Sequence, residues 1–391
     1  MKRLTRLGRD ESGMTFIFVG LGLVALLSAS MLAIDVGMLM TARSQAQNSA
    51  DAGALAGATA LVYDSYTDRS NTGPAKTSAV EAALANRVMS RAVSVTPADV
   101  EFPTGPNGEP NRVRVTVTRT GANAVSTLVA ASLAPFFGDH LRTVGIGATA
   151  TAEASPANAM TCVKPFTIPD RWTEMQTAPW DGLDTYDAFD SRGRPLANPD
   201  IYIPAGQSGY TGYNQESARG QRLEIRAATG NNITVSFYFS LALGKPAVTG
   251  GAEYDWNIAN CNTTVYRHND LLTSEPGAMT GPTVSGAQLL VDRDPGAYWD
   301  TATNRVRGSA FGTTQSPRIF PIPLYDPIYY DEGKRNGRNA DLRTANWIGF
   351  FIEEIQGNGI WGRIMPITGI IDQNAGPAPE GIFPMAIRLV R

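Results

Sequence analysis

The pattern of apolar and polar positions begins with one long helix. Residues 14–34 form a run of 21 residues without a charge, and a helix of that length is about 31 Å long, the thickness of a bilayer core. Residues 41–61 contain no Pro and are rich in Ala and Gln, which favours continuation of the helix. The pattern therefore predicts a transmembrane helix over 14–40 that continues as an exported helix to about residue 61.

A stripe of very small side chains follows one face of the exported part. Its members recur at helical spacing: Ala46, Ala50, Gly53, Ala54, Gly57 and Ala58. Such a stripe lets another backbone approach closely, and that backbone belongs either to a partner helix or to the protein's own domain. The polar residues beside the stripe are candidates for contacts in an assembly: Arg43, Gln47, Asn48 and Asp51.

Asp35 is the ionisable residue that ends the apolar run. A carboxylate at the edge of a membrane is costly unless it is paired or hydrated. Two interpretations stay open for it. Asp35 either pairs with a base or an amide of a partner in an assembly, or it lies in the headgroup layer.

Beyond a polar, turn-rich linker over 62–76, residues 77–155 predict a small α+β unit. The apolar spacing predicts its elements in this order: a helix over 77–93, a strand around Val113, Val115 and Val117, a helix over 123–137, and a strand over 143–153. The pattern thus predicts a stem helix followed by a small sheet domain.

From residue 156 to 391 the chain is rich in Pro, Gly, Trp and Tyr, with short apolar runs such as 233–243. These features predict a mostly β, loop-rich domain of about 230 residues. The fold class is therefore α+β. Five tryptophans lie near Asp, Asn or Gly: Trp180, Trp256, Trp299, Trp347 and Trp361. A sugar-binding face uses stacked aromatic rings, but filling of a loop-rich core is the favoured interpretation.

Composition excludes several functions. The chain has 33 basic and 36 acidic residues, a net charge of −3, so no basic excess exists to neutralise the phosphates of a nucleic acid. Only two histidines, His140 and His268, and two cysteines are present, too few for the common zinc motifs. No phosphate-binding or nucleophile motif occurs. We therefore expect no enzyme, no cofactor and no small-molecule substrate, and we expect His268 to be a solvated loop residue.

Charge placement predicts the topology. Four bases, Lys2, Arg3, Arg6 and Arg9, precede the apolar run, whereas Arg43 is the only base between that run and Arg69. The positive-inside rule places residues 1–13 in the cytoplasm and everything after about residue 40 on the other side of the membrane. The apolar run is longer than the core of a secretory signal peptide, so an uncleaved anchor is favoured.

The predicted export of the chain affects how its cysteines and its acidic turns are interpreted. Cys162 and Cys261 are the only thiols, and in an oxidising compartment we expect a disulfide between them. Asp292, Asp294 and Asp300 offer the hard oxygen ligands that Ca²⁺ prefers. Their spacing matches no EF-hand, so Asp-Pro-Gly turn chemistry is favoured and no metal site is expected.

Several motifs near the N-terminus together resemble the signature of a known family. They are an acidic-Gly step before the membrane (ESG), AIDVG at its far end, Arg43, and QNSADAGALAGA over 47–58. This combination resembles the N-terminal signature of the TadG-like proteins of tight-adherence (Flp, type IVc) pilus assembly, which are related to the TadE-like minor pilins. The segments CVKPFTIPDRWTE (162–174), DPGAYWDT (294–301) and IGFFIEEIQGNGIWGRIMPITG (348–369) extend the resemblance along the chain.

The resemblance implies a non-enzymatic, membrane-anchored component of pilus assembly and cell adhesion. Its partners would be the membrane, other assembly proteins and minor pilins. Many TadG-like proteins carry a von Willebrand A domain, but the nearest string here, DRSNT over 68–72, follows polar residues and is interpreted as a loop.

Processing leaves alternatives open. Prepilins of this group are cut after a Gly and usually carry Glu as the fifth mature residue. A cut between Gly13 and Met14 would put Phe18 there, which favours a permanent anchor. The alternatives are a minor pilin processed after Gly13 and incorporated in the fibre, and an envelope-anchored module that binds glycans or Ca²⁺.

Overall fold

The computed structural model describes residues 12–105, 108–129, 132, 143–176, 180–190, 192–230, 232–335 and 341–390. The chain folds as two compact units. The first takes in the residues up to Glu153 together with the C-terminal residues from Arg388, and the second comprises Ala154–Ile387. Both contain helices and strands, so the predicted α+β class is confirmed.

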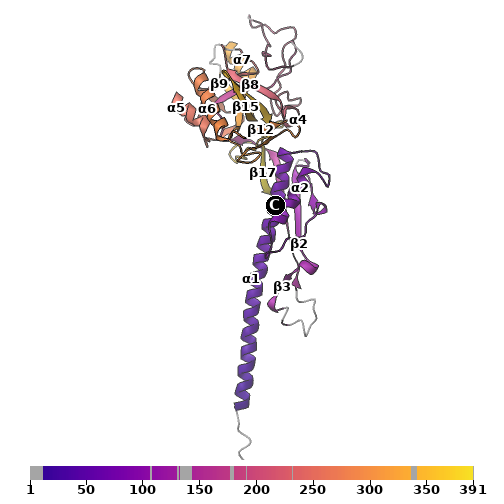
Figure 1. Cartoon of the computed structure of the whole chain (residues 1–391). Coiled ribbons are helices and arrows are strands. Elements are labelled where there is room, and N and C mark those ends of the chain that lie inside the picture. Colours follow the sequence, from indigo (N-terminus) through magenta and orange to yellow (C-terminus); the bar gives the residue numbers. More distant parts are fainter. Residues whose placement is uncertain are drawn as a thin grey trace, which may run out of the picture. The chain divides into compact units, whose positions relative to one another are not determined.

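Helix α1, Ser12–Tyr63, is 52 residues long and confirms the predicted continuous helix (indigo in Figure 1). Among the described residues it is the helix that is long and apolar enough to cross a membrane. Its N-terminal half leaves its large apolar side chains exposed, and its C-terminal half is buried along one face within the first unit.

Helix α2, Pro74–Ala85, packs along the C-terminal half of α1. It begins within the predicted linker, and the prediction of a helix over 77–93 is wrong at its C-terminal end. There the backbone reverses, with Met89 and Ser90 at φ 48° and 64°. The backbone N–H of Met89 donates to the side-chain oxygen of Gln45 on α1 at 2.7 Å, so a contact with α1 supports the turn.

The sheet of the first unit has the order β1-β2-β5-β17. Its strands are β1 (Val100–Glu101), β2 (Arg112–Arg119), β5 (Ile146–Pro156) and β17 (Met385–Val390). Val113, Val115 and Val117 are buried, as their alternation predicts. The predicted strand over 143–153 is two strands, because β4 (Thr143–Val144) ends before β5 begins.

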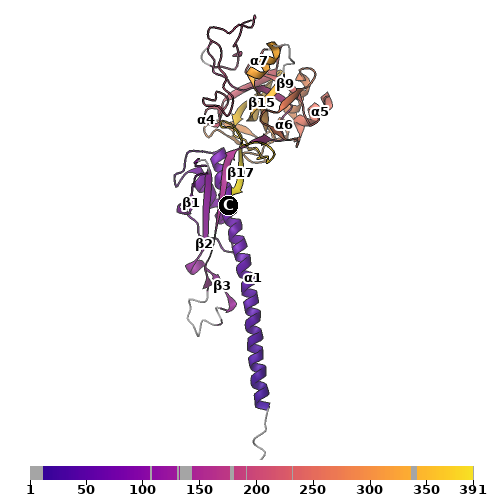
Figure 2. The same cartoon turned by 180° about the vertical axis from the view of Figure 1, so that it is seen from behind.

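Strand β3, Val125–Ser126, pairs with β4 in a separate two-stranded ribbon. Figures 1 and 2 both show β3 beside α1, closer than β2 to the N-terminal end of that helix. The predicted helix over 123–137 is wrong at its start, where a 3-10 turn (Gly121–Asn123) leads into β3. Most of its remainder lies outside the described residues.

Six strands of the second unit close into a barrel. They are β7 (Phe166–Pro169), β8 (Arg222–Ala227), β9 (Phe237–Ala242), β14 (Ile319–Tyr325), β15 (Leu342–Gln356) and β16 (Gly359–Met365). The order is β15-β14-β7-β9-β8-β16, and β16 pairs back onto β15. The β14–β7 and β8–β9 pairs are parallel and the others antiparallel. Closure removes the free edges that an open sheet exposes.

Shorter elements surround the barrel. They are β6 (Ala159–Met160), β10 (Tyr266–Arg267), β11 (Leu271–Ser274), β12 (Tyr298–Asp300), β13 (Arg305–Arg307), α4 (Gln215–Ala218), α5 (Gly251–Ala259), α6 (Thr280–Arg293) and α7 (Pro327–Arg335). Helices α5 and α6 lie side by side in Figures 1 and 2. A Cβ at Gly286 of α6 would lie 2.5 Å from Cγ2 of Ile258 on α5, so their close approach requires glycine.

Candidate functional site

The small-residue stripe of α1 packs on the protein's own first unit. Its buried alanines include Ala46, Ala50, Ala54 and Ala58 on α1, which are matched by Ala75, Ala79 and Ala83 on α2. A Cβ at Gly57 would lie 2.7 Å from Cγ1 of Val113, and one at Gly53 would lie 2.9 Å from the backbone oxygen of Ala79. Both glycines therefore allow the close approach of α2 and β2, and the stripe faces these elements.

The polar residues beside the stripe divide into two groups. Gln47 donates to Asp51 along the helix at 2.8 Å, and buried Ser49 donates to the backbone oxygen of Ala83 at 2.8 Å. Arg43 and Asn48 are exposed. The face of α1 that is available to other molecules thus carries Arg43, Gln47 and Asn48.

Asp35 has partners within the chain. Its two carboxylate oxygens accept hydrogen bonds from the backbone N–H groups of Leu128 and Val129, each at 2.6 Å. The side chain is only 4% exposed. Because the donors lie more than 90 residues away in sequence, nothing in the local pattern pointed to this pairing.

The first residues of α1 hold the candidate processing site. Gly13 and Met14 are exposed, and the large apolar side chains from Phe16 to Val36 stay open to their surroundings. Such a surface needs an apolar medium or an apolar partner.

A second buried carboxylate of the first unit is Glu153, at the end of the sheet. Arg112 contacts it at 2.7 Å and Arg388 at 3.2 Å. Burial raises the pKa of Glu153, but the hydrogen bonds from the two guanidinium groups outweigh burial, so that its pKa lies below the ordinary value. Through this ion pair, β17 is bound to the sheet by its side chains as well as by its backbone.

In the second unit, Cys162 and Cys261 form a disulfide that joins positions 99 residues apart. Nearby, the ammonium group of Lys164 donates to the backbone oxygens of Ile258 and Asn260, at 2.5 and 3.0 Å. These oxygens belong to the C-terminal end of α5, where a positive charge is favourable. Burial, with a smaller contribution from Arg293, lowers the pKa of Lys164 to about 8.

The structure does not bring the three calcium candidates together as ligands. Asp294 is buried and accepts hydrogen bonds from Ser316 and from the backbone of Ala310. Asp292 accepts from Gln288 of the same helix, and Asp300 accepts within its own turn. Within the described ranges, no group of three or more His, Cys, Asp or Glu side chains is placed to hold a metal ion.

Asp170 forms a buried polar centre at the end of β7. One oxygen accepts from the backbone N–H groups of Arg171 and Tyr213. The other accepts from the hydroxyl groups of Tyr202 and Tyr210, at 3.0 and 2.9 Å. Burial raises the pKa of Asp170 to about 6, and these hydrogen bonds oppose that rise. The carboxylate thereby connects Tyr202, Tyr210 and Tyr213 to the end of β7 in the barrel.

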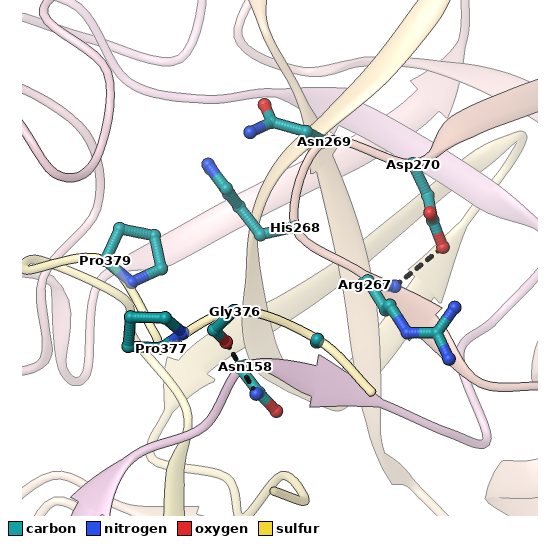
Figure 3. Close-up of a pocket in the computed structure, with 9 residues that line it drawn as sticks. Asn158, Arg267, His268, Asn269, Asp270, Gly376, Pro377 and Pro379 are labelled. Atoms are coloured by element: carbon teal, nitrogen blue, oxygen red, sulfur yellow. Dashed lines mark hydrogen bonds between the residues drawn. The ribbon is translucent and has the colours of Figure 1, made fainter. Parts of the chain in front are cut away.

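A pocket of about 480 Å³ opens on the second unit. Figure 3 shows His268 on one side of it and Pro377 and Pro379 on the other. His268 lies in a turn, as predicted, but its ring is half-buried rather than fully solvated, and its Nδ1 lies 2.9 Å from the backbone oxygen of Ala345. Burial lowers the pKa of His268 and so favours the neutral ring.

The polar side chains around this pocket are bonded within the protein. Asn158 donates to the backbone oxygens of Asp372 and Gly376, and Arg267 pairs with Asp372 at 2.6 Å. They hold the loop that carries the prolines.

The tryptophans do not form one face. Trp172 and Trp347 are fully buried and Trp299 is nearly so, whereas Trp256 is half exposed. Arg222 stacks over Trp361 at 4.4 Å. This distribution fits the filling of a core better than a sugar-binding platform.

Helix α1 joins an exposed apolar half, long and apolar enough to cross a membrane, to a half that is buried against a small sheet. Residues 13–60 match the family described as "Putative Flp pilus-assembly TadE/G-like". The predicted resemblance is therefore confirmed for this segment, and it ties the chain to Flp pilus assembly. No curated protein and no solved structure matches the chain.

Proposed function

We propose that this protein is a non-enzymatic, single-pass component of tight-adherence (Flp) pilus assembly. It is anchored in the bacterial inner membrane by residues 14–40, with residues 1–13 in the cytoplasm and both units on the opposite side. The observation that carries the proposal is the division of α1. One half exposes large apolar side chains and carries no charge from Met14 to Ile34, and the other half is integrated into a folded unit through its small-residue stripe.

The family match supports the pathway, and the charges support the orientation. Residues 13–60 match a pilus-assembly family, and the bases concentrated before the apolar run favour a cytoplasmic N-terminus. Because the matched family belongs to pilus assembly, the same match supports contacts with other pilus components, and we propose minor pilins or the assembly machine.

Docking would use exposed polar side chains of α1 that lie outside the buried stripe. The stripe itself is filled by α2 and β2, so a partner helix has no access to it in the folded unit. Arg43, Gln47 and Asn48 are exposed just beyond the membrane segment. They supply charge and amide groups for a partner that lies next to the anchor.

One alternative is a minor pilin processed after Gly13. The observation in its favour is the exposure of Gly13 and Met14 at the start of α1, which leaves the bond between them accessible to a peptidase. Such a subunit would bury its apolar half against other pilins in the fibre instead of in lipid.

Intact mass measured on washed membranes and on sheared surface fibres separates these functions. Full-length chain confined to membranes is the expected result. A species that begins at Met14 within the fibres would establish the minor pilin instead. A chain that begins near residue 31 in the soluble exported fraction would contradict both and leave a secreted binding protein.

A further inference from the structure

The first turn of a helical segment that begins at Leu128, after β3, meets α1 at the point where the apolar run of α1 ends. Asp35 comes directly after 21 uncharged residues, so in a membrane-spanning α1 it lies about 31 Å from the inner boundary, at the outer edge of the hydrocarbon. Its carboxylate accepts hydrogen bonds from the backbones of Leu128 and Val129. The turn is therefore held at the depth of the outer membrane surface.

Burial of Asp35 makes this position compatible with lipid. Free backbone N–H groups are costly at the edge of an apolar medium, and Asp35 accepts from two of them. With 4% of its surface exposed, its carboxylate is covered by the turn and does not face the acyl chains. A carboxylate and two amides that would each be unfavourable in lipid thus satisfy one another.

The exposed surface around Asp35 is apolar. Leu128 is 46% exposed, and on α1 the neighbours of Asp35 in sequence, Ile34 and Val36, are exposed as well. The exposed apolar surface of the membrane helix therefore continues onto a second segment of the chain. Because this apolar surface is continuous with that of the spanning helix, the lipid that surrounds the helix would also cover Leu128.

We propose that Leu128 is a second membrane contact, resting in the interfacial layer of the outer surface while Asp35 holds its turn against α1. The partner is the lipid bilayer itself. Two points of contact fix the depth and the rotation of α1, which a single apolar helix leaves free. The proposal rests on the membrane span of α1 and does not depend on the role in pilus assembly.

The test uses the full chain in liposomes of phosphatidylethanolamine and phosphatidylglycerol, with a fluorescent label that senses polarity on a single introduced cysteine. Three positions are compared: Leu128→Cys, Leu23→Cys within the apolar run, and Leu84→Cys on α2. Leu84 is the matched control, because it is an exposed leucine (38%) of the same unit that lies on α2 next to Ala83, the partner of Ser49.

We expect the emission at position 128 to shift to the blue and to be quenched by lipids spin-labelled near the headgroup. The label at position 84 should show neither effect. Position 23 should be quenched by lipids labelled deep in the acyl chain. A label at position 128 that behaves like the one at position 84, while position 23 is quenched, overturns the proposal. If position 23 is not quenched either, the membrane span itself is wrong.

The role of Asp35 is tested by Asp35→Asn, with Asp51→Asn as the matched control on the same helix. The amide keeps one acceptor oxygen for two donors, so we expect position 128 to lose its quenching while position 23 keeps it. Unchanged quenching in Asp35→Asn contradicts the holding role. Shielding of position 128 in native membranes but not in pure lipid would identify a protein as the partner and overturn the lipid contact.

Discussion

The two units are stabilised by side chains of opposite size. In the first, α1 meets α2 and β2 through Ala and Gly, and the backbones approach so closely that a single Cβ at Gly57 would clash. In the second, large rings such as Trp347, Phe350 and Tyr325 are fully buried, and a disulfide joins two segments that are 99 residues apart in the chain. Adding side-chain volume at this contact should therefore destabilise the first unit. Removing a large side chain or the disulfide should destabilise the second.

The two units can be observed separately in the whole protein. All six tryptophans lie between residues 172 and 361, within the second unit. Tryptophan fluorescence thus reports on the second unit alone. Far-UV circular dichroism contains a strong helical signal from α1 and α2 of the first unit.

The largest effect is expected from loss of the disulfide. Cys162→Ser with Cys261→Ser opens a loop of about 100 residues, which costs roughly 4–5 kcal/mol in the chain-entropy description. Urea unfolding in detergent micelles, followed by tryptophan fluorescence, should show this loss in the second unit. Reduced wild-type protein is the control and should match the variant. An equal loss in the helical signal would mean that the two units do not unfold separately, and would break the comparison.

The reverse experiment adds volume to the first unit. Gly57→Val places methyl groups where Cγ1 of Val113 already lies 2.7 Å from the new Cβ, and overpacking of this kind costs about 3 kcal/mol. Thermal melting by circular dichroism should show the loss. Gly37→Val is the control, because no atom lies within 4 Å of a Cβ built at Gly37. A stable Gly57→Val variant would contradict the close packing of α1 on β2.

The stability of the second unit should depend on pH, because this unit contains a buried carboxyl group, Asp170, that binds its proton more tightly when folded. The pKa of Asp170 rises from 3.8 to about 6 through burial. Its contribution to stability is therefore fully present below pH 3.8 and is lost as the pH rises through about 6. The expected loss is about 3 kcal/mol.

Asp170→Asn tests this pH dependence in urea unfolding between pH 4 and 7. The variant should show a flatter dependence in the second unit than the wild type. Some slope should persist, because burial also raises the pKa of Asp200 to about 6. An unchanged slope in Asp170→Asn would show that Asp170 does not carry the effect.

The smallest effect concerns one hydrogen bond between α1 and α2. Ser49→Ala removes the donor to the backbone oxygen of Ala83, which costs about 1 kcal/mol. Ser44→Ala, on an exposed part of the same helix, should leave the melting temperature nearly unchanged. Equal melting of the two variants would mean that small-residue packing alone holds the helices together.

The sequence was most informative where structure depends on nearby residues. The continuous helix from the apolar run to about residue 61 was predicted because its apolar length and its lack of Pro are local features. The alternation at Val113, Val115 and Val117 identified β2 for the same reason. The helical spacing over 77–93 misled at its end, where a contact between Gln45 and Met89 accompanies a reversal of the backbone.

The candidate site was predicted in its residue types but not in its partners. The stripe on α1 was visible from spacing alone, yet whether it faces a partner or its own unit depended on how α2 and β2 fold back over it. Asp35 was singled out as an unusual charge, but its donors at Leu128 and Val129 are distant in the chain. The buried centre at Asp170 was missed, since an Asp before an Arg looks like an ordinary loop residue.

By itself, the sequence determined the long apolar helix, its continuation to about residue 61, the α+β class and the family that residues 13–60 match. Each of these features depends on consecutive residues and on the period of the apolar positions. The tertiary structure alone decided the closure of the six-stranded barrel, the pairing of β17 with the sheet of the first unit, and the partners of Asp35 and Asp170. These features join residues that are far apart in the chain. Such pairings are selected by the packing and hydrogen bonding of the whole fold, which no local pattern records.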